Sequence, residues 1–241
     1  MITLSDAVFC HDPLTPAAVR ISAQQRAFGG TGLADFYRQI ENGRTTALIS
    51  ALSGAVTLLA LEGADFEELR AFLPGVGNHL WCEGDTAAKL GLGSACEGDI
   101  LCLNGGEKAQ KEIGDTRGFE PLSSVYPLLC TQFPLPSFET WYVDLFRNIS
   151  QGAQRVFSVF EGGEAVSCAL LSAVTDEAAI LSAVVTNENY RKRGLASECI
   201  KKALAFAGAR RVFVMTREPS LNGFYEQFGF APCGRWSETE I

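Results

Sequence analysis

Apolar and polar residues along the second half of the chain are spaced in a way that predicts strands, then a helix, then a further strand. Three apolar stretches rich in β-branched residues are separated by short turn sequences, which is typical of antiparallel strands. From Gly194 onward the apolar residues recur at helical spacing, with polar residues on the opposite face. The predicted elements are strands over 154–160, 165–174 and Ala178–Thr186, a helix over 194–207, a strand over Arg211–Thr216 and a helix over 220–228.

Two helices are predicted ahead of these strands, and the second has a regular apolar stripe. The first covers 124–131. The second follows Ser137, a residue type that caps helices, and ends at Gly152. Positions spaced at i, i+3, i+4, i+7, i+8 and i+11 share one helix face, so we interpret the stripe as core packing. It consists of Phe138, Trp141, Tyr142, Leu145, Phe146 and Ile149.

The first half of the chain has a similar order of predicted elements. Asp65 and Glu68 resemble a capping box at a helix start, and Pro74-Gly75 ends that helix. We therefore interpret the first half as a degenerate, truncated copy of the second; an unrelated α/β domain remains the alternative. The predicted elements are a helix over 33–40 ended by Asn42-Gly43, a hairpin over 45–52 and 55–61 around Ser53-Gly54, the helix from Asp65, a strand over 79–82, a helix over 85–90 and a strand over 99–103.

A glycine-rich charged stretch without periodicity, residues 104–120, marks a linker. The predicted domains are 1–115, a smaller α/β domain, and 116–241. Taken together, the elements predict a mixed α/β fold, in the α+β sense, with a mostly antiparallel sheet and flanking helices.

Composition and charge exclude several classes of partner. The 241 residues are 47% hydrophobic and 20% charged, which is typical of a globular protein, and the net charge is −8. An acidic chain is a poor ligand for duplex DNA or an anionic membrane. Basic residues cluster at Arg191–Arg193 and at Arg210 and Arg211, which indicates a local anion site.

The cysteines and histidines argue against disulfides and metals. The eight cysteines are scattered without a Cys-x-x-Cys pair, and there are two histidines, so we expect reduced thiols and no zinc site. Cys10, His11 and Asp12 are adjacent, but neighbouring residues point in different directions, and we do not interpret them as a nucleophile cluster. We see no signal peptide and no membrane span, and expect a soluble, cytoplasmic protein.

The turn between the strand Ala178–Thr186 and the following helix has the chemistry of an anion site. The first amides of a helix lack intrahelical acceptors and lie at the positive end of its dipole, so they suit a phosphate. Gly194 allows close approach of a ligand, and the cations Arg191, Lys192 and Arg193 add to the positive potential.

Two motifs in this region resemble those of the GNAT superfamily of acetyl-CoA-dependent N-acetyltransferases. Arg191, Gly194 and Ala196 match its Arg/Gln-x-x-Gly-x-Gly/Ala signature, and residues 224–230, Phe-Tyr-Glu-Gln-Phe-Gly-Phe, are similar to its Phe-Tyr-Glu-x-x-Gly-Phe stretch. The resemblance covers the chain from about residue 126 to its end. It implies an acyltransferase with acetyl-CoA as its cosubstrate, and no metal is expected.

The resemblance also implies site residues. The strand backbone would pair with the pantetheine arm, the turn amides would bind the pyrophosphate, and Tyr225 would be the general acid toward the CoA sulfur; a phenol stays protonated at neutral pH. In the same fold the helix after Ser137 would flank the acceptor, with one or two of Glu139, Tyr142 and Arg147 facing it. The expected cofactor-binding residues are Val184, Val185, Thr186, Arg191, Lys192, Arg193, Gly194, Leu195, Ala196, Ser197, Asn222 and Phe224.

The sequence departs from the family pattern at several positions. Glu218 stands where many members have an asparagine that contacts CoA, and the nearest asparagine is Asn222; Glu188-Asn189 replaces a common Pro-Glu. In the first half, Glu62 and Asp65 flank the equivalent turn and would repel a pyrophosphate, so that half should not bind CoA. The general base stays open among Glu139, Glu164, Glu188 and a chain of water molecules.

These observations predict an N-acyltransferase that transfers an acetyl group from acetyl-CoA to a primary amine by direct attack in a ternary complex. The acceptor is a small molecule or a peptide, nucleic acid and membrane are not expected as partners, and a homodimer is left open. The alternative is a non-catalytic acyl-CoA-binding or partner-binding module with the same fold. An unrelated nucleotide-binding α/β protein would need the turn to follow a buried parallel strand, whereas the hairpins favour antiparallel pairing.

Overall fold

A computed structural model describes residues 1–5, 14–105 and 121–241. They form two compact units: Met1–Cys102 together with Met215–Ile241, and Leu103–Val214. The last segment of the chain thus belongs with the first unit. The boundary predicted at 115/116, most of the predicted linker and the Cys10–Asp12 triplet lie outside the described residues, so the two-domain division at that boundary stays a prediction.

The first unit is built on a sheet of seven strands. All neighbouring strands in it pair antiparallel except β4 and β5, which are parallel. The strand order is β1 (Ile2–Leu4), β2 (Ala34–Glu41), β3 (Arg44–Leu52), β4 (Ala55–Ala60), β5 (His79–Glu83), β11 (Ala231–Glu240) and β6 (Cys96–Leu103).

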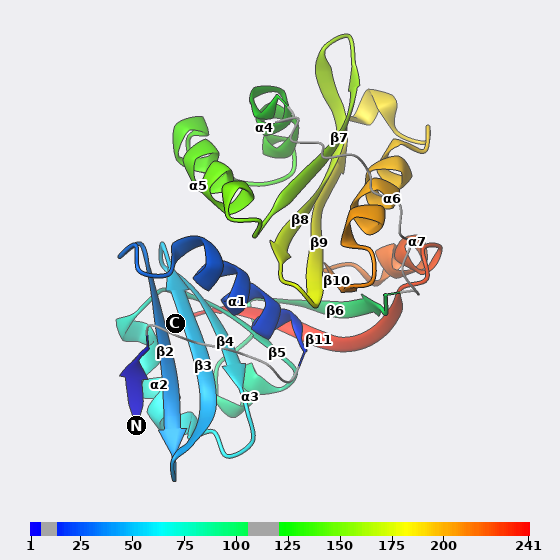
Figure 1. The fold of residues 1–241 in the computed structure, drawn as a ribbon. Coiled ribbons are helices and arrows are strands. Elements are labelled where there is room, and N and C mark those ends of the chain that lie inside the picture. The colour runs from blue at the N-terminus through cyan, green and yellow to red at the C-terminus, as the bar shows by residue number, and fades with distance from the viewer. Residues whose placement is uncertain (6–13, 106–120) are drawn as a thin grey trace. The chain divides into compact units, whose positions relative to one another are not determined.

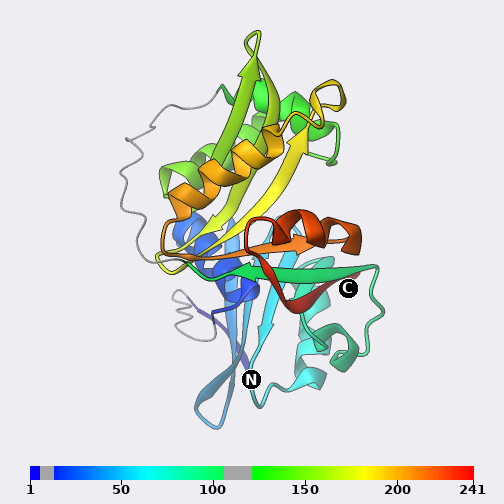
Figure 2. The same cartoon turned by 90° about the vertical axis from the view of Figure 1, so that its right-hand side faces the viewer.

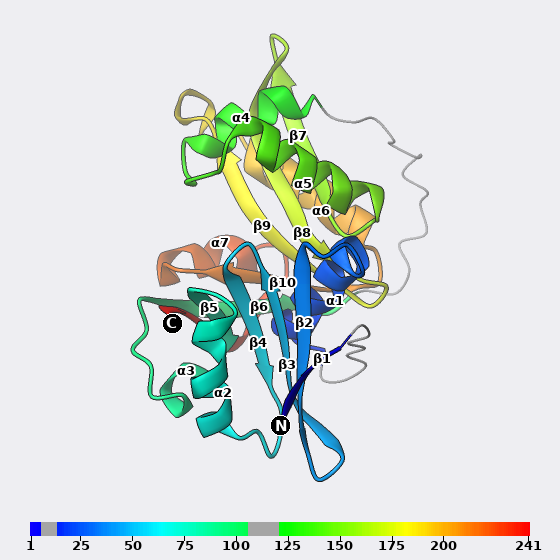
Figure 3. The same ribbon diagram turned by 90° about the vertical axis from the view of Figure 1, so that its left-hand side faces the viewer.

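Helices cover both faces of this sheet (Figures 1 and 3). α1 (Pro16–Phe28), capped by Thr15, lies on one face, where the Ser50 hydroxyl of β3 donates to Gln24 at 2.5 Å. On the other face lie α2 (Phe66–Phe72), its continuing 3₁₀ turn Leu73–Gly75, and α3 (Thr86–Lys89).

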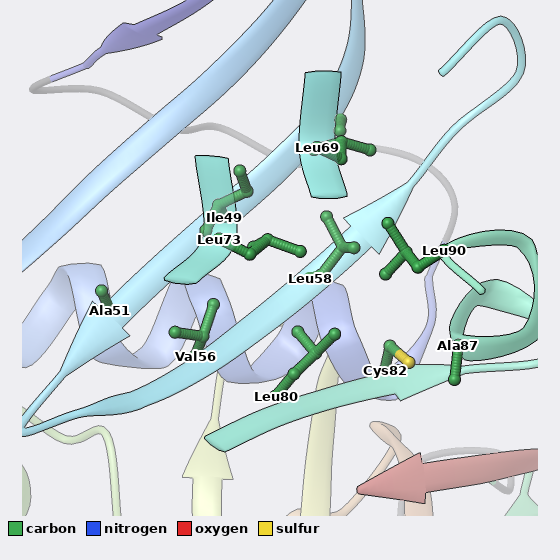
Figure 4. Packing of buried hydrophobic residues seen from close by; sticks show 11 residues of the cluster. Ile49, Ala51, Val56, Leu58, Leu69, Leu73, Leu80, Cys82, Ala87 and Leu90 are labelled. Atoms are coloured by element: carbon green, nitrogen blue, oxygen red, sulfur yellow. The ribbon is translucent and has the colours of Figure 1, made fainter. Parts of the chain in front are cut away.

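The core on the α2 face contains alternate side chains of strand β3. Ile49 and Ala51 of β3 point toward α2, whereas Ser50 between them faces α1, because successive strand residues point to opposite faces. Figure 4 shows the strand residues meeting the helices across this face. The labelled members are Ile49, Ala51, Val56, Leu58, Leu69, Leu73, Leu80, Cys82, Ala87 and Leu90.

The predicted helix over 33–40 is wrong, since this segment is strand β2. Asn42 and Gly43 have φ values of 51° and 74°, and they join β2 to β3 with Glu41 opposite Arg44. Two consecutive residues with positive φ make the tight hairpin turn that suits the strand twist, and Asn-Gly is the sequence that favours it. The helix α1 and the strands β1 and β11 were not predicted, whereas the hairpin at Ser53-Gly54 and the elements from Asp65 to Leu103 are confirmed.

The second unit has a smaller sheet with the predicted strands. The order is β10, β9, β8, β7 (Figure 2). β7 (Arg155–Glu161), β8 (Glu164–Val174) and β9 (Ala178–Thr186) are antiparallel, and β10 (Arg211–Thr216), whose residues up to Val214 belong here, is parallel to β9. α6 (Leu195–Ala207) packs on one face; α4 (Leu122–Cys130), with α5 (Phe138–Ser150) beside it, packs on the other. The predicted antiparallel approach to the turn is confirmed.

The apolar stripe of α5 is only partly buried, so its interpretation as core packing is wrong for Tyr142 and Phe146. Ser137 caps the helix through the amide of Thr140, as predicted, and Leu145 is buried. However, Tyr142 and Phe146 are 38% and 41% exposed. The rings pack mainly against one another, through the pairs Tyr126–Phe138, Tyr126–Trp141, Phe138–Tyr142 and Tyr142–Phe146.

The two halves of the chain share one connectivity. In the first, three antiparallel strands, β2 to β4, lead into α2 and then into β5, which is parallel to β4. In the second, β7 to β9 lead into α6 and then into β10, which is parallel to β9. The interpretation of the first half as a degenerate copy is therefore supported by topology. None of the helices in the described ranges is both long and apolar enough to cross a bilayer, and no cysteine described forms a disulfide.

Candidate functional site

The candidate site starts where β9 runs past its pairing with β10. The parallel register within the second unit extends from Arg211 opposite Ala178 to Val214 opposite Leu181. β9 then continues to Thr186 beside β8. A strand that runs on past its neighbour can present backbone N–H and C=O groups to a ligand.

A β-bulge shapes this free part of β9. Ser182 pairs with Leu170 and Val185 with Cys168, so two residues of β9 lie opposite one of β8. Ala183, inside the bulge, has φ of 48°, which is uncommon for a residue other than glycine. Bulges bend a strand and redirect its backbone, and they occur often beside active sites. The predicted strand residues Val184, Val185 and Thr186 all lie at or just after this bend.

The side chains of these strand residues are used mainly for packing. Val185 is buried against α4 and β8, and the Thr186 hydroxyl lies 2.8 Å from the Ser167 hydroxyl. Their contribution to a ligand site would thus come from the main chain, as the family resemblance implies.

The turn after β9 is held by its own basic side chains. Asn187 caps the 3₁₀ turn Glu188–Tyr190 by accepting from the Asn189 amide at 3.0 Å. Arg191 Nε donates to the Thr186 carbonyl at 3.3 Å, and the Arg193 guanidinium lies 4.8 Å from the Tyr190 ring centre. The arginines therefore fix the turn that leads into α6 and remain exposed.

The N-terminus of α6 is an open set of donors. Its first backbone bond runs from the Glu198 amide to the Gly194 carbonyl at 3.0 Å, and no side chain caps the helix. The amides from Lys192 to Ser197 donate to no acceptor in the part of the chain that the structure describes. Lys192 and Gly194 have φ of 63° and 80°, in the left-handed region, so the chain bends sharply just before the helix begins. Aligned free amides, the helix dipole and nearby cations favour an anion here.

Tyr225 lies in α7 (Asn222–Glu226), which belongs to the first unit. Its ring meets Phe224 and Phe230 edge to face, at centroid distances of 5.3 and 6.0 Å, and is 8% exposed. Burial raises the pKa of the Tyr225 phenol to about 12. The hydroxyl donates to no acceptor among the described residues, so its proton is both retained at neutral pH and uncommitted.

Asn222 has a structural task in the same unit. Its side-chain oxygen accepts from the Thr216 hydroxyl at 2.7 Å, and its Nδ2 donates to Asp99 at 2.8 Å. These two bonds tie the start of α7 to the strands. Whether Asn222 also contacts CoA stays a prediction, as does the role of Phe224, which packs between Tyr225 and Phe228.

The structure singles out no general base. Glu139, Glu164 and Glu188 are all exposed, and nothing in their placement distinguishes one of them from the others. The predicted site residues from Val184 to Ser197 follow one another in the second unit, whereas Asn222, Phe224 and Tyr225 belong to the other unit. The bulge at Ala183 escaped the sequence analysis, because an extra strand residue leaves the apolar run of β9 unchanged.

The second unit is thus an α/β fold in which a bulged strand runs into a basic, uncapped helix start, an arrangement that suits an anion. Comparison with known proteins makes this class specific. Residues 122–230 match the family model of the acetyltransferase (GNAT) family. The C-terminal half of the chain therefore carries a GNAT acetyltransferase domain.

Solved structures extend the likeness in fold to the whole chain. A GCN5-related N-acetyltransferase from Kribbella flavida has a TM-score of 0.60 and 13% identity, over 95% of this chain and 96% of that one. A tandem GNAT protein from the clavulanic acid biosynthesis pathway has a TM-score of 0.59 and 13% identity, over 95% and 89%. A GCN5-related N-acetyltransferase from Sphaerobacter thermophilus has a TM-score of 0.57 and 13% identity, over 100% and 95%. A search of curated protein sequences found no match.

Proposed function

We propose that this protein is an N-acyltransferase that transfers an acetyl group from acetyl-CoA to a primary amine by direct attack in a ternary complex. The observation that carries the proposal is the uncapped N-terminus of α6, reached from the bulged end of β9 through the turn at Gly194. The GNAT domain supports an acyltransferase in general, and this anion site supports a nucleotide-bearing acyl donor in particular.

Each part of the described site has one task in this proposal. The amides from Lys192 to Ser197, with the exposed cations of the turn, bind the pyrophosphate. The backbone of Val184, Val185 and Thr186 pairs with the amides of the pantetheine arm. Acetyl-CoA supplies the acyl group as a thioester.

Tyr225 gives its proton to the departing sulfur in this proposal. A phenol whose pKa burial raises to about 12 is fully protonated at neutral pH, as a proton donor must be. The amine nitrogen bonds to the acyl carbon and gives up a proton to water as the C–S bond breaks, and the Tyr225 phenolate then regains a proton from water. The net charge of −8 favours a cationic acceptor through long-range attraction.

The test separates binding from turnover. Calorimetry should show saturable CoA binding, and a thiol-release assay over a panel of primary amines should show transfer from acetyl-CoA. Arg191→Glu should weaken CoA binding by roughly tenfold, since it places a like charge at the helix start. Arg44→Glu, on the exposed β2–β3 turn of the other unit, is the matched charge reversal and should leave binding unchanged.

The alternative is a non-catalytic acyl-CoA-binding module. It is favoured by Glu218, an exposed carboxylate where the family pattern has an asparagine, and by the exposure of all three candidate bases. Saturable CoA binding without transfer to any amine would establish this alternative. A protein that binds neither CoA nor acetyl-CoA would overturn both proposals.

A further inference from the structure

The first unit contains a cavity of about 680 Å³ at the ends of β4 and β5. The parallel register of these strands ends with Leu58 opposite Cys82, and the cavity lies where the strands continue beyond that pair. Its volume is that of an ordinary small-molecule site. Among its lining residues, Leu61 and Phe66 are half-buried and carry apolar side chains.

The helix start beside this cavity is closed to phosphates. The Asp65 carboxylate accepts from the amides of Glu67 and Glu68, at 3.0 Å each, and so occupies the donors at the start of α2. At the corresponding place in the second half, the amides before α6 have no such cap. The ends of β4 and β5 therefore still border a cavity, but the amides at the start of α2 are not available to bind a pyrophosphate.

The charges of the lining favour a cation. Its two basic side chains are engaged: Lys89 pairs with Asp85 at 3.0 Å, and Arg235 pairs with Glu97 at 3.1 Å and approaches Asp99 at 3.7 Å. Glu62 has no ion-pair partner in the described ranges.

Glu83 adds a second carboxylate to the lining, in a less exposed place. It accepts from the Ala17 amide and the Thr15 hydroxyl, and Arg20 lies near enough to favour its charged form. Burial nevertheless dominates and raises the pKa of this carboxyl. A bound cation would stabilise its charged form in return.

We propose that this cavity is a second ligand site, for a small primary ammonium compound with an apolar body. The ammonium group lies against Glu62 and Glu83, and the apolar body packs on Leu61 and Phe66. The site lies within the first unit and is independent of the proposed CoA site, so either proposal can fail without the other.

Phenethylamine is a suitable probe, with 2-phenylethanol and phenylacetate as neutral and anionic counterparts of similar size. Calorimetry on the full chain, saturated with CoA or free of it, should show one saturable site for phenethylamine and much weaker binding of the other two. Glu62→Gln should lower the affinity for phenethylamine by about 3–10-fold, the range for one charge-assisted contact. Glu62→Lys should abolish binding. Glu161→Gln, an exposed carboxylate on β7, is the matched control and should change nothing.

A second variant tests the cavity without changing charge. Ala64→Trp places a large ring in the lining and should abolish binding while circular dichroism confirms an unchanged fold. Equal binding of phenylacetate, displacement of the amine by CoA, or full affinity in Glu62→Lys would each overturn the proposal.

Discussion

Tyr225 is the residue on which the proposed chemistry can be tested most directly. Tyr225→Phe keeps the ring and its contacts with Phe224 and Phe230, so CoA affinity should hardly change. Loss of the proton donor should lower kcat by about 10²–10⁴-fold if proton transfer limits the rate. Turnover at saturating acetyl-CoA, measured beside CoA affinity, checks this. Wild-type turnover in the variant would remove the phenol from the mechanism.

The same phenol should make stability depend on alkaline pH. The folded protein holds its pKa at about 12 and the unfolded chain at 10.0, so deprotonation favours unfolding above pH 10. The stabilising effect is complete below pH 10 and is lost as the pH rises toward 12. Between pH 9 and 11 the wild type should lose about 1 kcal/mol more unfolding free energy than Tyr225→Phe. Urea titrations at both pH values measure the difference, and Tyr142→Phe, an exposed tyrosine, should behave as the wild type.

Gly194 tests the turn before α6. Its φ of 80° is strained for any other residue, and a Cβ there would meet nothing within 4 Å. Gly194→Ala should therefore cost about 1–2 kcal/mol through the backbone alone, and weaken CoA binding by shifting the amides. Gly162→Ala has the same features, with φ of 61° and open space, on the β7–β8 turn. It should cost a similar amount of stability and leave CoA binding unchanged; equal CoA losses in both variants would contradict this role for the turn.

Local chemistry in the sequence predicted the caps and glycine turns well. Ser137 and Asp65 cap helices as expected, because a cap depends on atoms two or three residues away. Asn42-Gly43 was misread because the same pair can end a helix or close a hairpin. What decides between them is the pairing of β2 with β3, which no residue of the turn encodes by itself.

At the level of elements, periodicity predicted where α5 lies in the chain more reliably than how deeply its residues are buried. α5 begins and ends close to its predicted bounds, yet part of its aromatic face is exposed. An apolar stripe shows which residues share a face, whereas burial depends on how much of that face a neighbouring element covers. The bulge in β9 is similar, since a strand's apolar run does not show where its pairing shifts.

The cap of α2 gives a prediction at this scale. Asp65→Ala leaves the Glu67 and Glu68 amides without their acceptor and should destabilise the first unit by about 1–2 kcal/mol. Asp65→Asn keeps an accepting oxygen and should recover most of that loss. Urea unfolding of both variants measures it. Equal destabilisation by Ala and Asn would show that charge, and not capping, matters at this position.

At the scale of the whole molecule, composition could suggest a linker but could not show which strands pair. The last strand, β11, lies between β5 and β6 of the first unit, and its Trp236 is 5% exposed and donates to the Thr216 carbonyl at 3.4 Å. β11 pairs with strands that lie more than a hundred positions earlier in the chain, and such pairing leaves no local pattern. The order of elements in the two halves, by contrast, was visible because it repeats.

Removal of β11 should therefore damage the first unit. A chain that ends at Phe230 leaves β5 and β6 without their shared partner, so the first unit should lose cooperative unfolding. Hydrogen exchange resolved by segment measures this, with loss of protection expected in β3 to β5. Unchanged protection there would mean that the unit is stable without its inserted strand.

The position of β11 also sets the order of events while the ribosome makes the chain. β6 is complete at Leu103, and β11 begins 128 residues later, at Ala231. At roughly 5–20 residues per second, β5 and β6 remain for roughly 6–26 seconds without the strand that pairs with both of them. Unpaired strand edges readily accept foreign strands. The nascent first half should thus depend on a chaperone, and slow translation of the second half should increase its aggregation.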